Sequence, residues 1–149
     1  MSDDVEAAAR SAYEALDPES DRAELLAEFA AINDLVDRNV TGALNANLAF
    51  YRGLTSGEGF DMTEGEILDE VWGQEPEIRQ DTTGWIFGYM TFAYETLSDD
   101  QLRAYIEMAE SDAGKELNRA LFAGFDAVFG DVSFEMGQAT ARFSVGDDI

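Results

Sequence analysis

LSDDQLRAYIEMAESDAGK, residues 97–115, is the stretch that decides the fold. Its first half is typical of an amphipathic helix, because Ser98 and Gln101 make a capping-box pattern and an apolar stripe at helical spacing follows. Ser111 then stands where it can cap a further helix, and Gly114 comes three residues later. A glycine here permits a close helix–helix corner that a side chain would block. The stretch therefore predicts two helices joined by a sharp turn.

The rest of the chain continues this helical pattern. Asp17 and Pro18 are typical of the N-cap and first turn of a helix, and weak helix formers at 39–42 predict a kink or break there. The small polar residues and two glycines of 55–61 predict a loop. Apolar steps of three and four predict helices over 2–16, 19–54, 63–73, 78–97, 98–110 and 111–143.

Strand-like alternation of useful length is missing from the sequence, which predicts an all-α fold. We expect a single-domain bundle of about six to seven helices over residues 1–149. The segment 78–97 is apolar nearly all round, so we expect it to be the central, aromatic-rich helix. Its longest apolar run, 85–94, is about half the roughly 20 residues of a membrane-spanning helix, which indicates a buried helix and no transmembrane segment.

The charge balance excludes one group of partners. The chain has 32 Asp and Glu against 9 Lys and Arg, and its net charge is −23. A field of this sign repels phosphate, so we expect no nucleic acid and no anionic membrane surface as a direct partner. Solubility or adaptation to a salty medium explains the acidity, and a surface for a basic protein is the alternative.

The missing residue types exclude much catalytic chemistry. There is no His and no Cys. Ser-His-Asp and Cys-His catalysis, zinc sites with thiolate or imidazole ligands, and Glu-x-x-His di-iron sites are therefore excluded. We expect no cofactor and predict no catalytic residue. Carboxylates near 58–70 remain, and Glu58, Asp61 and Glu64 are the candidate ligands for calcium or a carboxylate-based hydrolase. Chance clustering on a solvated surface is the simpler reading, since the Asp-x-Asp-x-Asp-Gly calcium loop is missing.

Two further features leave alternatives open. Trp85, Tyr89 and Phe92 share one stripe of the aromatic helix and are the candidate wall of a pocket for a small hydrophobic ligand, although such residues more often fill a core. Arg52 interrupts an otherwise apolar helix. A buried carboxylate partner and an anion-binding role both fit it.

The turn at 111–115, together with residues 45–54 and 75–79, resembles the bacterial family called domain of unknown function 2059. Members are typically exported, so the resemblance implies a periplasmic protein of which this chain is the mature C-terminal part of a longer precursor. The family has no established activity, so it implies no catalytic residue. The acidic start of the chain, 1–6, is unlike a secretory signal, and if Met1 is the natural start we expect a cytoplasmic protein instead.

These observations favour a non-enzymatic, exported helical domain that acts in protein–protein or cell-envelope interactions. The expected partner is another protein or a second copy, bound through an apolar helix face. The first alternative is a carrier of a small hydrophobic ligand in a cavity lined by the helix 78–97. The second is a carboxylate-based hydrolase or a calcium-binding domain near 58–70.

Raising the ionic strength is expected to stabilise the protein, because salt screens the mutual repulsion of its acidic side chains. The Debye length falls from about 10 Å at 0.1 M to about 3 Å at 1 M salt. The melting temperature, measured across this range, should rise steadily. A flat response would contradict the expectation.

Overall fold

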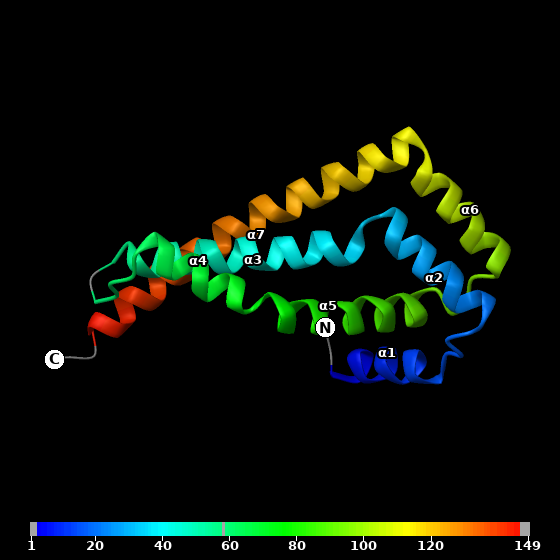
Figure 1. Cartoon of the computed structure of the whole chain (residues 1–149), viewed down its shortest axis with the longest axis horizontal. Helices are drawn as coiled ribbons and strands as arrows, with labels where there is room; N and C mark the ends of the chain where they lie inside the picture. The colour runs from blue at the N-terminus through cyan, green and yellow to red at the C-terminus, as the bar shows by residue number, and fades with distance from the viewer. Residues whose placement is uncertain (1–2, 58, 147–149) are drawn as a thin grey trace. The chain divides into compact units, whose positions relative to one another are not determined.

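The computed structural model describes residues 3–57 and 59–146 and confirms the all-α class (Figure 1). Within these residues the chain forms seven helices and no strand. Their bounds are α1 Asp3–Ala15, α2 Asp21–Ile32, α3 Leu35–Thr55, α4 Glu64–Gly73, α5 Glu75–Ala93, α6 Asp99–Glu110 and α7 Asp112–Gly146. In that part of the chain, none of the helices has the length and apolar character needed to cross a bilayer.

The chain divides into two compact units. Unit 1 comprises Met1–Arg38 and Arg79–Ala120, and unit 2 comprises Asn39–Ile78 and Leu121–Ile149. The long helices α3, α5 and α7 each contribute residues to both units. The expectation of one domain over 1–149 stays a prediction.

Three helix starts expected from the sequence are confirmed. Thr63 and Ser98 each head a complete capping box, at the starts of α4 and α6 respectively. Ser111 Oγ accepts a hydrogen bond from the backbone N–H of Gly114 at 3.0 Å, which caps α7. The helices begin where these short-range patterns predict, because a cap satisfies backbone N–H groups that the helix itself leaves unpaired.

Two expected boundaries are wrong. Ser20, and not Asp17, is the N-cap of α2. The break expected near 39–42 lies at Asp34, whose φ of 54° is left-handed and ends the helical run before α3. Asn118 of α7 stabilises this break, since its amide donates to the backbone carbonyl of Asn33 at 2.9 Å. Packing overrides the weak propensity of 39–42, where Val40 is almost fully buried.

The core of unit 1 joins α2, α5 and α6. The helices α2 and α6 lie side by side in this unit. Phe29 anchors an aromatic cluster, with its ring centroid 5.1 Å from that of Tyr105 and 5.6 Å from that of Tyr94. Burial raises the pKa of Tyr94 to about 12, with Tyr105 adding to the effect. The fully packed members are Leu25, Leu26, Phe29, Ala30, Ile86, Met90, Leu102, Ile106 and Ala109.

Three aromatic side chains of α5 do not fill the core, contrary to the sequence-based preference. Trp85, Tyr89 and Phe92 are exposed, whereas Ile86 and Met90 of the same helix are buried. The buried side is the one that faces α2 and α6, so the aromatic side remains at the surface. The apolar character of α5 on all sides therefore does not mean burial on all sides.

Unit 2 is built from α4 and from parts of α3, α5 and α7. Two glycines allow a close approach of α3 and α7: a Cβ at Gly53 would overlap the carbonyl oxygen of Phe134, and one at Gly137 would lie 2.8 Å from the backbone nitrogen of Leu54. The backbones of α3 and α7 thus touch here. On the other side of α3, Asn47 donates to the side chain of Gln74 at 2.7 Å, at the end of α4.

Replacing Gly114 with alanine is expected to destabilise the protein by about 1–3 kcal/mol, because the new Cβ would lie 2.8 Å from Ala109 Cα at the α6–α7 corner. Gly84→Ala is the matched control in the same unit. A Cβ there meets nothing within 4 Å, so the variant should gain about 0.5–1 kcal/mol from helix propensity. Urea unfolding of both variants measures the difference. Equal changes in the free energy of unfolding for Gly114→Ala and Gly84→Ala would contradict the close contact at the α6–α7 corner.

Candidate functional site

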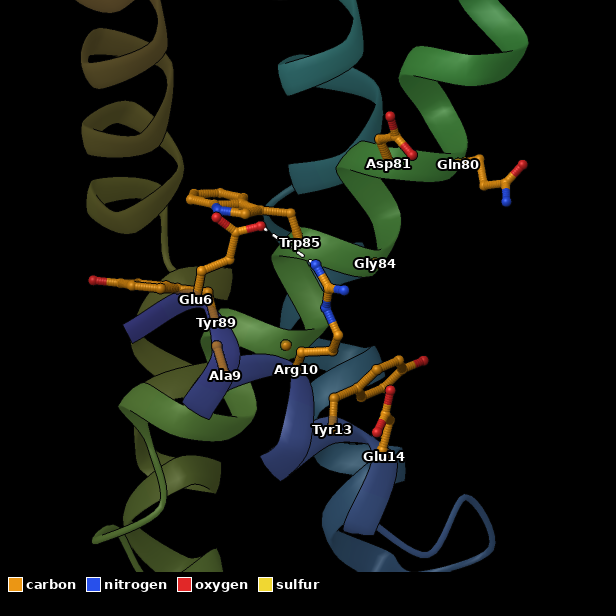
Figure 2. Close-up of a pocket in the computed structure, with 11 residues that line it drawn as sticks. Glu6, Ala9, Arg10, Tyr13, Glu14, Gln80, Asp81, Gly84, Trp85 and Tyr89 are labelled. Atoms are coloured by element: carbon orange, nitrogen blue, oxygen red, sulfur yellow. Dashed lines mark hydrogen bonds and ion pairs between the residues drawn. The ribbon is translucent and has the colours of Figure 1, made fainter. Parts of the chain in front are cut away.

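A groove lies between α1 and α5 in unit 1 (Figure 2). Its volume is about 620 Å³, and it opens to solvent. The two helices lie far apart in the sequence but come together around Gly88, where a Cβ would sit 3.3 Å from the carbonyl oxygen of Ala9. The groove is lined by Glu6, Ala9, Arg10, Tyr13, Glu14, Gln80, Asp81, Gly84, Trp85, Gly88 and Tyr89.

Aromatic rings form part of the groove's lining. Trp85 and Tyr89 are one turn apart on α5, and their rings stack with centroids 5.5 Å apart and an interplanar angle of 9°. Tyr13 of α1 stacks on Phe87 with centroids 5.9 Å apart. Trp85 and Tyr89 are 48% and 41% exposed, so their rings remain accessible to a ligand.

Glycines shape the space between the two helices. Gly88 allows the backbones of α1 and α5 to approach, whereas a Cβ on Gly84 would have no neighbour within 4 Å. The volume beside Gly84 is therefore open, and a side chain placed there would enter the groove.

The lining is acidic on balance. It contains three carboxylates, those of Glu6, Glu14 and Asp81, and one guanidinium, that of Arg10. Arg10 pairs with Glu6 at 3.5 Å, as the dashed line in Figure 2 shows. The remaining two carboxylates give the groove a negative charge that no basic side chain of the lining offsets.

Two of the three candidate ligand-binding residues lie at the groove, and the third does not. Trp85 and Tyr89 line the groove, whereas Phe92 is exposed and is not part of the lining. Sequence reasoning missed the α1 contribution, Arg10 and Tyr13 above all. Their three-residue spacing places them on one helix face, but nothing in the sequence indicates that α1 packs beside α5.

The carboxylates near 58–70 do not form a metal site in the part of the chain that the structure describes. No group of three acidic side chains converges there. Glu58 lies outside the described residues, and Asp61 is exposed in the connection before α4. Glu64 is hydrogen-bonded to Arg52, which lowers the pKa of its carboxyl. Glu66 closes the capping box, and the backbone N–H of Thr63 lowers its pKa.

The partner of Arg52 is thus an exposed carboxylate. Its guanidinium Nε donates to Glu64 Oε1 at 3.1 Å, and its Nη2 donates to the same oxygen. This hydrogen bonding raises the pKa of Arg52. The pair links α3 to α4 in unit 2, and both side chains are about half exposed, so the partner of Arg52 is not the buried carboxylate expected from sequence.

A second surface feature lies on α7 within unit 2. A row of large apolar side chains, all exposed, follows the helix at steps of three, four and seven residues. Phe129 is 58% exposed and Phe143 is 78% exposed. We call this set the α7 row: Leu121, Phe125, Val128, Phe129, Val132, Met136 and Phe143.

No protein-family model matches this chain, and neither a curated protein nor a solved structure matches it. The resemblance of residues 97–115 to the family called domain of unknown function 2059 stays a prediction.

Trp85→Ala is expected to cost less than about 1 kcal/mol of stability, because the side chain is half exposed at the groove. Ile86→Ala, at the next residue but 3% exposed, should cost about 2–5 kcal/mol. Denaturant unfolding of the two variants compares them directly. A loss at Trp85 as large as that at Ile86 would show that the indole is packed in a core.

Proposed function

We propose that this protein is a non-enzymatic helical interaction module that functions as a homodimer through the α7 row. The carrying observation is the exposure of seven large apolar side chains on one side of a single helix. Monomeric proteins rarely expose contiguous apolar patches of this kind, and such patches mark interaction surfaces.

In unit 2, one side of α7 packs on α3 and a different side carries the exposed α7 row. Small residues face α3: a Cβ at Gly137 would overlap the carbonyl oxygen of Phe50, and Ala141 is almost fully buried. The centre of the α7 row lies about 150° away around the helix, at 100° per residue. Close packing on α3 therefore uses the small side and leaves the large apolar side for a partner.

The row is large enough for a stable dimer. Seven side chains that are about half exposed or more present on the order of 700 Å² per copy, given 150–250 Å² for a whole aromatic side chain. Standard interfaces bury about 800 Å² on each partner. From Leu121 to Phe143 the row is about 33 Å long at 1.5 Å per residue.

The low charge of this segment permits a second copy to approach it. Residues 121–146 carry four charged side chains, Asp126, Asp131, Glu135 and Arg142, for a net charge of −2. The whole chain carries −23. Two copies that meet along this segment bring together a weakly charged stretch of an acidic protein.

We place the two copies antiparallel, because the helix dipoles of an antiparallel pair oppose each other favourably. With a two-fold axis at Val132, the middle of the row, residue 142 of one copy lies opposite residue 122 of the other, and the two rows cover each other along their whole length.

The resemblance to an exported bacterial family supports a place in the periplasm for this module, where the dimer would act in envelope interactions. The hydrophobic-carrier alternative is less favoured, because the groove that contains Trp85 and Tyr89 is open to solvent and carries carboxylates. The calcium or hydrolase alternative lacks converging carboxylates in the described part of the chain.

Val132→Glu is expected to weaken dimerisation by on the order of 100-fold, because two carboxylates would be buried against each other at the axis. Sedimentation equilibrium over a range of concentrations measures the dissociation constant, and circular dichroism checks the fold. Trp72→Glu is the matched control, since Trp72 is an exposed apolar residue of α4 in the same unit. A wild-type protein that stays monomeric, or equal weakening by both variants, would contradict the proposal.

A further inference from the structure

The groove between α1 and α5 has a chemistry that the proposed dimer does not use. It combines accessible aromatic rings with an excess of carboxylates, and all its lining residues belong to unit 1. We infer that this groove binds a small organic cation: an ammonium group attached to an aromatic or alkyl body. The inference does not depend on the dimer.

The aromatic lining supplies the first element of recognition. The faces of Trp and Tyr carry negative electrostatic potential, so a cation within about 6 Å of a ring centroid is attracted to it, most strongly to Trp. Trp85 and Tyr89 stack on each other, so a ligand contacts the outer faces and edges of these half-exposed rings. The organic body of the ligand would pack on these faces while its charge lies toward the carboxylates.

The carboxylates supply the second element. Arg10 is engaged by Glu6, which leaves Glu14 on α1 and Asp81 on α5 as uncompensated charges on the two sides of the groove. Their field favours a cation and opposes an anion of the same shape. The net charge of −23 raises the local concentration of any cation near the surface.

Size and shape select a small molecule over a bare metal ion. A volume of about 620 Å³ lies within the range of roughly 300–1,000 Å³ for small-molecule sites. A metal ion needs several converging oxygen ligands, and no group of three acidic side chains converges within the described residues. The open space at Gly84 admits the body of a ligand against the α5 backbone.

Benzyltrimethylammonium is the probe for this site. Trp72→Phe leaves Trp85 as the only tryptophan, so its fluorescence reports on the groove alone. In this background, benzyltrimethylammonium should change the Trp85 emission saturably, and calorimetry should give the same dissociation constant. Neopentylbenzene, which has the same shape without the charge, and benzenesulfonate, an anion, should bind at least tenfold more weakly.

Two variants place the binding in the groove. Glu14→Gln with Asp81→Asn should weaken binding of the probe at least fivefold. Glu107→Gln with Glu110→Gln removes the same charge from exposed positions on α6 and is the matched control, which should bind as the parent does. Gly84→Leu should abolish binding by filling the groove, and its fold should be retained because a Cβ at this position meets nothing within 4 Å.

The outcomes separate the alternatives. The inference is supported if binding is charge-selective, is lost in Gly84→Leu, and is weakened by the Glu14 and Asp81 substitutions but not by the α6 control. Equal binding of neopentylbenzene would make the groove a hydrophobic-ligand site and overturn it. Equal weakening by the α6 control would show that the effect comes from net charge alone and would overturn the inference. Binding of a lysine-rich peptide but not of benzyltrimethylammonium would assign the groove to a basic protein and would also overturn it. Absence of binding would also overturn the inference.

Discussion

The rest of unit 2 depends on the contact between the backbones of α3 and α7. Gly53 and Gly137 permit this contact, since a Cβ on either would overlap a carbonyl oxygen of the opposite helix. A helix pair held so closely must meet through its small residues, which selects the side of α7 that carries Gly137 and Ala141. The large apolar side chains of the same helix, Phe129 among them, are thereby left at the surface.

In unit 1, glycines allow a close approach of two helices at two further places. Gly88 allows α1 to approach α5, and Gly114 allows α7 to begin directly beside the end of α6. In each case a missing Cβ determines where two helices meet, and the larger residues beside it determine what is left accessible. The aromatic pair Trp85 and Tyr89 is exposed for this reason: α1 comes close at Gly88 and leaves an open groove beside Gly84.

Local signals in the sequence predicted the helices well. Thr63, Ser98 and Ser111 cap helices as their short-range patterns indicate, because a cap depends on residues within one turn. The break at Asp34 was missed because it depends on Asn118, more than 80 residues later. Trp85 and Tyr89 were named as ligand-binding candidates, but the partners of that groove on α1 could not be. Hydrophobic spacing shows that a helix has an apolar side, and close contacts between distant segments decide whether that side is buried.

Disulfide formation by introduced cysteines tests the central claim, that the outward side of α7 is covered by an antiparallel second copy. The chain has no cysteine, so each single substitution reports alone. In a glutathione redox buffer, Val132→Cys should form an intermolecular disulfide, because the two copies of residue 132 meet at the axis within the 4.4–6.8 Å Cα separation that a disulfide needs. Phe143→Cys should stay reduced, because its two copies would lie about 33 Å apart at 1.5 Å per residue. Bonds at both positions would indicate a parallel pair, and a reduced cysteine at 132 would contradict the account.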